Sequence, residues 1–321
     1  MTSNIIKTAI AHAIYKHSAD VGVKTPAHII EYAASRWGRD GAVTKALVNP
    51  IVAVGSGLVN ETLVRDEFVQ AVFSGSILGK LNGLVEVPAM TRVNVESTPV
   101  TAPFVGEHAM IPAYQGNFGF AAVDVRKVAI TTVVTEELLR MTGNAAESFI
   151  SGQLQRALSR GIDAAFVGSQ ARDAVSPNGL GAPGVSTTSA NFYAGVASFQ
   201  GDLSKASVIV NPRTAATLRS PTEQLITASG GFYGGLPVIT SYAVPVGLLW
   251  IVDGSRVLAY IGAATVNMSS ESLVMLDDGT GGTPGTVVGL FQEMKRALAA
   301  VQYVDFEFVP GAAVSVTVAT S

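Results

Sequence analysis

The sequence predicts an α+β fold, because helix and strand patterns occupy largely separate stretches of the chain. Apolar residues spaced three and four apart mark helices at 61–81 and 144–167. Alternating apolar and polar residues mark strands at 92–96 and 123–126. Short apolar runs bounded by turn residues then continue from 207 to the end, which is typical of a mixed α/β region.

Composition narrows the class of protein. The chain has 321 residues and a formal net charge of −3, with 48% hydrophobic residues. A chain with this apolar content can bury enough surface to fold, so it is not a disordered protein. Because its net charge is close to zero, it also lacks the basic surface of a dedicated nucleic-acid binder. The absence of cysteine excludes disulfides and thiolate chemistry. No run reaches the roughly 18 apolar residues of a membrane-spanning helix, since the longest candidate, 242–252, contains Pro245 and Gly247.

The low charge favours a subunit of a large assembly. Charged residues make up 14% of the chain, where soluble domains average about 25%. Interface cores are depleted in charge, so a subunit whose faces are largely covered needs few charged residues. The alternative is a monomer with a surface rich in Gly, Ala, Ser and Thr.

Helical signals also occupy the N-terminal residues. Ile6, Ile10 and Ile14 recur at four-residue spacing, in a segment that lacks the long apolar centre and cleavage site of a secretory signal. Thr25 and Pro26 predict the start of a second helix, because proline at the first helical position sacrifices no hydrogen bond. We therefore expect an N-terminal helical arm.

Residues 92–126 predict a long β-hairpin with a broad end. Its two alternating segments flank a span, 97–120, that is rich in proline and glycine. A structureless span of this size is rare in a compact domain, and an isolated hairpin is marginal in water, so the arm should dock on something, most simply a neighbouring subunit. Aromatic side chains are enriched at interface anchors, which makes four residues of the arm candidate intersubunit contacts, with packing on the arm's own base as the alternative: Phe104, Tyr114, Phe118 and Phe120.

The strongest helix signal lies between 135 and 168. Thr135 predicts the N-cap of a short helix with Glu136 and Glu137 in its first turn. Asn144 and Glu147 then predict a capping box at the start of a longer helix, which Gly168 ends. One apolar face should run along this helix, formed by Phe149, Ile150, Leu154, Ala157, Leu158, Ile162 and Ala165.

The remaining chain predicts alternating strands and loops. A Gly/Pro/Ser-rich loop at 176–189 leads to a strand at 207–210 and to a helix that begins at Asn211 and Pro212. Residues 287–303 fit a long strand better than a helix, and 277–285 predict a polar loop. The other predicted strands are 237–240, 248–252, 256–260, 272–276 and 314–318.

No motif for catalysis or for a cofactor is complete. Gly179–Gly184 fits GxGxxG, but the strand before it and the helix after it are missing, which favours a plain loop. Glu136 and Glu137 are adjacent on a helix and point apart, so they are better explained by the helix dipole than as a catalytic pair. The histidines are scattered and lack the carboxylates of a metal site: His12, His17, His28 and His108. The sequence therefore predicts no catalytic, cofactor-binding or metal-binding residue, and a protein that is not an enzyme.

An ordered set of segments carries a family resemblance. The segments are Gly57–Val59, Glu67–Val69, Ser76–Leu78, the hairpin, Val134–Leu139, Gly161–Gly168, Val210–Thr214, Gly235–Val238 and Phe291–Val318. In this order they resemble the major capsid proteins of tailed bacteriophages with the HK97 fold, over about residues 55 to 321.

The resemblance implies an HK97-like capsid fold. Its parts are an N-terminal helical arm, an extended β-hairpin loop (the E-loop), a peripheral domain with a long spine helix, and an axial α/β domain. The implied boundaries are 1–60 for the arm or a scaffolding-like segment, 61–93 from the arm to the peripheral domain, 94–125 for the extended loop, 126–185 for the peripheral domain with the spine helix, 186–271 for the axial domain, 272–303 for peripheral-domain strands and loop, and 304–321 for a C-terminal axial strand.

The function implied by the resemblance is that of a structural major capsid protein. Copies would self-assemble as hexamers and pentamers into an icosahedral shell that encloses double-stranded DNA, in the virion and, during assembly, in the host cytoplasm. Portal, scaffold or decoration proteins are further implied partners, and no membrane or cofactor is. A near-neutral subunit agrees with this, because a strongly basic inner wall would bind DNA too tightly for packaging and release.

One departure from the family concerns cross-linking. The family member that cross-links its subunits uses a lysine in the extended loop, an asparagine before the late strand and a glutamate nearby. Here 97–125 contains no lysine and 277–288 no asparagine, and only Glu293 lies in a matching region. We therefore expect no autocatalytic isopeptide bonds.

Two other classes of protein are alternatives. An encapsulin-type nanocompartment shares the shell fold but encloses protein cargo. An α/β hydrolase or nucleotide-dependent enzyme would need motifs that this sequence lacks.

Overall fold

The computed structural model describes residues 68–96, 102–107, 110–113, 118–141, 143–221, 223–271, 273–276 and 287–318, with the backbone alone at 96, 139–141 and 143–147. The predicted helices of the N-terminal arm, the loop 277–285 and Tyr114 lie outside these residues. Within the predicted helix 61–81, residues 68–75 are helical and a 3₁₀ turn follows at Leu78–Lys80.

The chain divides into two compact units. One contains Val128–Gly161 and Ala263–Gln302 together with the described residues up to Ser76. The other contains Ile77–Lys127, Ile162–Gly262 and the residues from Tyr303 onward. Each unit is thus assembled from stretches far apart in the sequence, and several long elements contribute residues to both.

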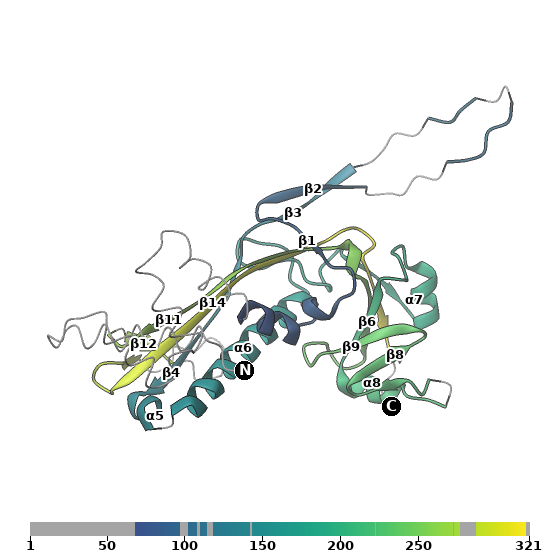
Figure 1. The fold of residues 1–321 in the computed structure, drawn as a ribbon. Coiled ribbons are helices and arrows are strands. Elements are labelled where there is room, and N and C mark those ends of the chain that lie inside the picture. The colour runs from purple at the N-terminus through teal and green to yellow at the C-terminus, as the bar shows by residue number, and fades with distance from the viewer. Residues whose placement is uncertain are drawn as a thin grey trace, which may run out of the picture. The chain divides into compact units, whose positions relative to one another are not determined.

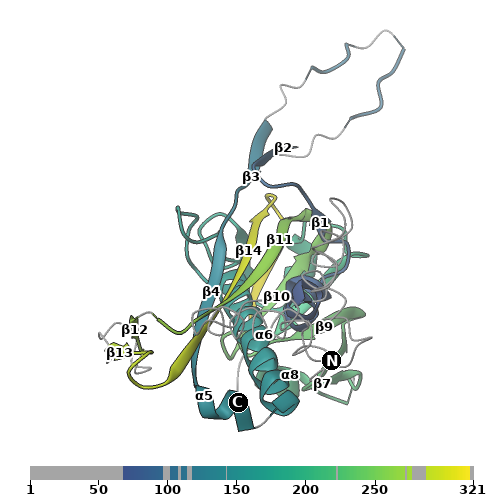
Figure 2. The ribbon, with the colours of Figure 1, turned by 60° about the vertical axis from the view of Figure 1, so that its left-hand side comes forward.

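Four strands form one sheet, in the order β1, β11, β14, β4. These strands are β1 (Val85–Glu86), β11 (Val257–Ser269), β14 (Lys295–Phe308) and β4 (Lys127–Thr135). Figure 2 shows β4, β14 and β11 side by side. Two further pairs are antiparallel ribbons: β2 (Thr91–Glu96) with β3 (Phe118–Val123), and β12 (Leu273–Met275) with β13 (Val287–Gly289).

A second sheet has seven strands in the order β5, β15, β10, β6, β9, β8, β7. The interior strand β10 pairs antiparallel with both β15 and β6, so Ile251 lies between Val314 and Val208. The strands are β5 (Ser186–Ser189), β6 (Ala206–Val210), β7 (Ile226–Thr227), β8 (Gly230–Tyr233), β9 (Leu236–Thr240), β10 (Leu248–Asp253) and β15 (Ala313–Thr317).

Two short helices, α7 (Phe192–Ser198) and α8 (Pro212–Leu218), pack against the core of this sheet. Asn211 caps α8, because its side-chain oxygen accepts the N–H of Arg213 at 2.9 Å and Pro212 takes the first helical position. The start of α8 is therefore where the sequence predicts it. On α7, a Cβ at Gly195 would lie 2.9 Å from Val316, so this position admits only the smallest residue.

The long helix α6 (Gly143–Val167) follows the short helix α5 (Glu136–Met141). Its buried positions recur every four residues and are at most 1% exposed: Ile150, Leu154, Leu158, Ile162 and Phe166. The prediction that Phe149 belongs to this face is wrong, because Phe149 is 65% exposed. Adjacent helical residues point about 100° apart, so only one of Phe149 and Ile150 can face the core.

The loop that fits GxGxxG closes the C-terminal end of α6. The backbone N–H groups of Gly179, Leu180 and Gly181 donate to the carbonyls of Gln170, Phe166 and Gly168 at 2.8–3.0 Å. Their donors are used within the protein, where an anion site would leave them free. A Cβ at Gly179 would lie 2.0 Å from the Gly168 oxygen, which explains the glycine by close backbone approach.

Several predictions of secondary structure need correction. The last residues of the predicted loop 176–189 form β5, which pairs in parallel with β15. The strand predicted at 123–126 ends at Val123, and β3 begins earlier, at Phe118. Strands β7 and β8 and helix α7 were not predicted at all, since glycine-rich and short polar segments carry little periodicity. The preference for strand over helix at 287–303 is confirmed, but the single long strand is wrong, because a turn at 290–294 separates β13 from β14.

Asp163 is a buried carboxylate at which three segments meet. It is 7% exposed on α6; its Oδ1 accepts the N–H of Ile77 at 2.7 Å and its Oδ2 accepts the hydroxyl of Ser241 at 2.9 Å. Burial raises the pKa of Asp163 above its ordinary value, against the opposing effect of these hydrogen bonds and of the Lys80 charge.

Among the described residues no helix is long and apolar enough to cross a membrane.

The raised pKa of Asp163 predicts a pH dependence of stability. Above the ordinary aspartate pKa of about 3.9, the folded chain keeps a proton that the unfolded chain has lost, so this group lowers stability as pH rises through the raised pKa. Asp163→Asn cannot ionise, and its amide oxygen can still accept the N–H of Ile77 while its NH2 group donates to the Ser241 hydroxyl oxygen, which reverses that bond. As pH increases from about 3.9, the unfolding free energy of the wild type, measured by urea titration, should therefore fall relative to that of the variant. Parallel pH curves for the two proteins would contradict this.

Candidate assembly surfaces

The hairpin β2–β3 has two unlike faces. Its register places Val93 opposite Ala121 on one face and Asn94 opposite Phe120 on the other. The first face packs on its own unit: Ala121 and Val123 are buried in a cluster with Leu258. In Figure 1 the two strands leave the sheet that holds β1 and β11 as a separate ribbon.

The outer face and the end of this arm carry exposed apolar side chains. Phe118 is 73% and Phe120 63% exposed, and Phe104 is fully exposed. Met110 and Ile111, which the sequence analysis did not single out, are also exposed. Their signal was the same as for the aromatics, namely large apolar residues in a proline-rich span without periodicity.

None of the three described aromatic candidates packs on the base of the hairpin. Phe120 has a cationic neighbour, since the Arg92 guanidinium carbon lies 5.2 Å from its ring centroid on the same outer face. Such a contact adds little at an exposed site. Phe118 is two residues from Phe120 on β3 and shares its outer face, and Tyr114 is not described. The structure therefore leaves these apolar surfaces uncovered in the single chain.

A buried charged cluster holds the segment that follows the hairpin. Asp305 of β14 is fully buried, and its Oδ2 accepts from Arg126 Nη1 at 2.7 Å and from Arg172 Nη2 at 2.6 Å. The same oxygen accepts the backbone N–H of Asp124 at 2.6 Å. The carbonyl of Arg126 accepts the N–H of Val304 at 2.9 Å. Residues 124–126 are therefore fixed to β14 by main-chain and side-chain bonds together.

Arg172 extends this cluster to a second carboxylate. Its Nη1 donates to Glu307 Oε2 at 2.6 Å, and Glu307 Oε1 accepts from Asn178 Nδ2 at 2.7 Å. Desolvation opposes the charge on Arg172, but the hydrogen bonds and negative charges of Asp124, Asp305 and Glu307 outweigh it and raise the pKa of Arg172. The guanidinium thus stays charged and bridges the loop after α6 to β14.

The other face of the same strand end is aromatic. Phe306 and Phe308 alternate with Asp305 and Glu307, and both rings contact Phe166 of α6 with centroids 5.3 and 5.2 Å apart. Strand alternation therefore separates a charged face from an aromatic face. The cluster was not predicted from the sequence, where its signal was the pair of carboxylates set in the apolar run 304–308.

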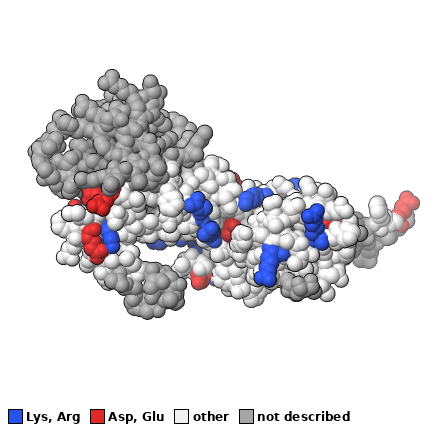
Figure 3. Space-filling model, turned by 90° about the horizontal axis from the view of Figure 1, so that it is seen from below, with Lys and Arg blue, Asp and Glu red and all other residues white. Residues whose placement is uncertain are grey.

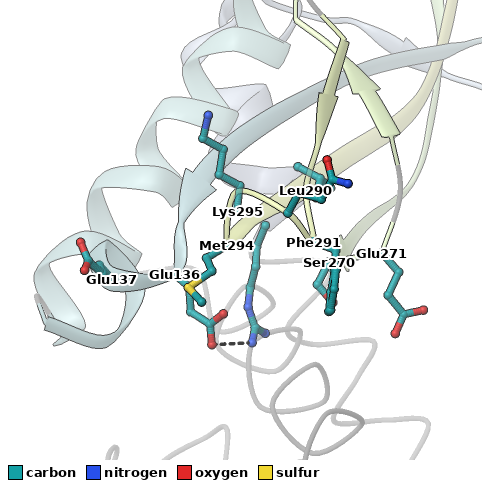
Figure 4. A pocket seen from close by; sticks show the side chains of 10 residues that line it. Glu136, Glu137, Ser270, Glu271, Leu290, Phe291, Met294 and Lys295 are labelled. Atoms are coloured by element: carbon teal, nitrogen blue, oxygen red, sulfur yellow. Dashed lines mark hydrogen bonds and ion pairs between the residues drawn. The ribbon is translucent and has the colours of Figure 1, made fainter.

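A pocket of about 780 Å³ lies at the start of α5. Phe291 and Met294, 78% and 74% exposed, form part of its wall beside Leu290. Arg296 is buried, and its Nη2 lies 3.1 Å from Glu136 Oε1, the contact drawn as a dashed line in Figure 4. The pocket therefore combines exposed apolar surface with a charge pair that is already neutralised.

Glu136 and Glu137 do not face one another. Figure 4 shows Glu136 directed at the arginine and Glu137 on a separate side of the helix turn. Thr135 caps this helix as predicted, with its hydroxyl oxygen accepting the N–H of Leu138 at 3.4 Å. The geometry offers no carboxylate pair for acid–base chemistry here.

The described residues hold no group of three or more His, Asp or Glu side chains that could bind a metal ion. All four histidines lie outside the residues that the structure describes. Glu293, the one residue in a position matching the cross-linking family member, is exposed and pairs with the partly buried Lys295.

Charged side chains are sparse on the surface. Figure 3 shows one face of the molecule, and most of its described atoms belong to uncharged residues. This agrees with the 14% of charged residues in the whole chain.

Comparison with known proteins matches residues 55–234 to the Phage capsid family. A curated relative, the "Capsid polyprotein" of Pseudomonas phage PAJU2, is 26% identical over 278 residues, which is 77% of this chain. The match spans only 42% of that relative's length.

Solved structures of the same fold come from phages and a related particle. One from Gordonia phage Cozz has a TM-score of 0.55 at 15% identity, covering 77% of this chain and 87% of that one. One from Mycobacterium phage Bobi has a TM-score of 0.52 at 17% identity, covering 77% and 91%. A structure described as the capsid of a native GTA particle has a TM-score of 0.51 at 14% identity, covering 77% and 91%.

The chain is a mixed α+β protein with a two-faced hairpin, whose outer face and end carry exposed apolar side chains. The family match extends over more than half of the chain, and the chain belongs to the phage capsid family. The curated relative is named a capsid polyprotein and the GTA structure a capsid, and none of these matches favours an encapsulin-type nanocompartment.

The Asp305 cluster predicts a large and selective loss of stability. Asp305→Asn removes the charge that neutralises the buried Arg126 guanidinium, and breaking a buried pair costs about 3–5 kcal/mol. Glu293→Gln breaks an exposed pair and should cost less than about 1 kcal/mol. Urea unfolding of unassembled full-length subunits measures both. Equal midpoints for the two variants would show that the cluster does not stabilise the fold.

Proposed function

We propose that the protein is the major capsid protein of a tailed phage, and that its copies self-assemble into an icosahedral shell around double-stranded DNA. The observation that carries the proposal is the hairpin β2–β3, which buries one face in its own subunit and leaves Phe118 and Phe120 on the other face uncovered. Exposed aromatic surface of this kind is typical of a contact with another chain. A second copy of the same chain is the simplest partner.

The proposed parts follow the family pattern. The hairpin serves as the extended loop, α6 as the spine helix, and the seven-stranded sheet as the axial domain. The four-stranded sheet and α6 together form the peripheral domain, and residues before 61 form an arm or a scaffolding-like segment. The domain boundaries given above remain predictions.

The proposed partners and location are those of a virion protein. Copies contact one another in hexamers and pentamers, with Phe104, Tyr114, Phe118 and Phe120 among the contact residues. Packaged DNA lies near the shell without specific binding, and portal, scaffold or decoration proteins join it during assembly in the host cytoplasm. The subunit requires no cofactor.

Assembly of the protein expressed alone tests the proposal. We expect electron microscopy of the purified full-length chain to show closed, uniform polyhedral particles, because the uncovered apolar surfaces are buried only between copies. Stable monomers that form no particles at high concentration would contradict self-assembly. Particles filled with a host enzyme would favour a nanocompartment instead.

Phe104→Ala combined with Phe118→Ala should weaken particles without weakening the subunit. Both side chains are exposed in the single chain, so the unfolding free energy should change by less than about 0.5 kcal/mol. Particle yield on size-exclusion chromatography should fall sharply. The matched control is Val93→Ala on the inner face of the same hairpin, which should cost the subunit about 1 kcal/mol. Identical effects of the two changes on unfolding and on yield would sink the idea.

A further inference from the structure

We propose that Asp305, with Arg126 and Arg172, sets the direction in which the hairpin β2–β3 leaves the subunit. The cluster is then a positioning device for the arm rather than only a source of stability. Its value for docking on a neighbouring copy rests on the proposed function, whereas its effect on the arm's direction does not.

The hairpin is attached at two roots. At the entering root, the N–H of Val87 donates to the carbonyl of Ala259 at 2.9 Å, and Met90 turns the chain with a φ of 56°. At the leaving root, residues 124–126 lie between β3 and β4 and belong to no strand. Buried ion pairs hold this second root, where Asp305 pairs with Arg126 and Arg172.

Apolar packing beneath the hairpin fixes its face but not its angle. Val93 and Val95 are partly buried against the cluster of Ala121, Val123 and Leu258. Burial of apolar surface is non-directional, so these contacts tolerate a small rotation of the ribbon. Hydrogen bonds weaken steeply when their angle or distance changes, and the root at 124–126 is the place where they converge.

Three hydrogen-bond donors, two from the root and one from the loop after α6, converge on Asp305 Oδ2. The Asp124 N–H and the Arg126 guanidinium come from the root itself, and the Arg172 guanidinium comes from the loop after α6. Arg126 Nη2 also donates to the carbonyl of Asp173 in that loop, at 2.5 Å. The root is therefore held between β14 and the loop, with its orientation fixed from both.

The cluster is not arranged for the greatest number of bonds. The other carboxylate oxygen, Asp305 Oδ1, and the Arg126 Nε are buried without a hydrogen-bond partner among the described residues. Buried ion pairs often add little net stability over apolar replacements, and specifying one geometry is the role attested for some of them. Convergence on one oxygen at the root of an arm fits that second role.

Small rotations at the root have large effects at the end of the arm. Each paired strand has six residues, and a strand of that length spans about 20 Å. A rotation of about 10° at the root then moves the far end of the ribbon by about 3.5 Å, roughly the rise of one residue along a strand. Phe104 and Ile111 lie beyond that end, so their docking position depends on the angle at the root.

Spin labels can measure this angle directly. The chain contains no cysteine, so Asn94→Cys on β2 and Tyr242→Cys, both exposed, introduce two unique labels in one unit. Full-length doubly labelled chain is mixed with an excess of unlabelled chain, which removes distances between copies. Double electron–electron resonance then gives the distribution of the distance between the two labels.

We expect Asp305→Asn to broaden this distribution and shift its mean relative to the otherwise unaltered labelled chain. Arg172→Gln, at a partly exposed side chain, provides a milder second variant in case Asp305→Asn does not fold. Leu249→Ala, in the core of the seven-stranded sheet, is the control: it lowers stability without touching the root, and should leave the distribution unchanged.

Unchanged distributions in the folded Asp305 or Arg172 variant would overturn the proposal, and the cluster would then be structural only. Equal broadening by Leu249→Ala would overturn it as well, because general loosening would explain the result. The measurement needs no shell, so a failure here is separate from a failure of the assembly experiment above.

Discussion

The carboxylate of Asp305 satisfies donors that the fold would otherwise bury without a partner. The chain must pass from an arm that leaves the subunit into the long strand β4, and at this point it carries Arg126 into the interior. A buried guanidinium needs a compensating charge, and the buried end of β14 supplies it. Because β14 alternates, the same strand end places Phe306 and Phe308 against α6. One strand end therefore couples the root of the arm to the main helix.

Local signals explain which parts of the fold could be read from the sequence. The start of α8 follows from Asn211 and Pro212, and the end of α6 follows from Gly168, because caps act within a few residues. The hairpin was visible as alternation, although its second strand lies before the predicted position. Strand β5 was not visible, since a run of serine and threonine becomes a strand only through its partner β15.

Long-range contacts explain what the sequence concealed. Arg126 and Asp305 are 179 residues apart, and the sequence pattern around either residue does not predict its contact with the other. Phe149 was wrongly assigned to the buried face of α6, because the apolar pattern in the sequence fits Phe149 and its neighbour Ile150 equally well. Only the packing in the structure shows that Ile150 is the buried one. The aromatic residues of the arm remain predicted contacts. Phe104, Phe118 and Phe120 are exposed in the single chain, as expected where a span without periodicity has no core of its own to fill.

The opposed faces of the hairpin divide the work of its residues. Val93 and Ala121 pack against the interior of their own subunit, while the side chains of Phe118 and Phe120 are exposed on the opposite face. Because the side chains of Phe118 and Phe120 are exposed, we expect mutations there to leave the fold of the single chain intact, so that in the proposed shell they can accumulate in step with changes on the opposing surface. Lineages that share this subunit fold are thus free to diverge in how their copies meet, and sequence similarity along the arm can fade on one side of the ribbon while the other side stays fixed.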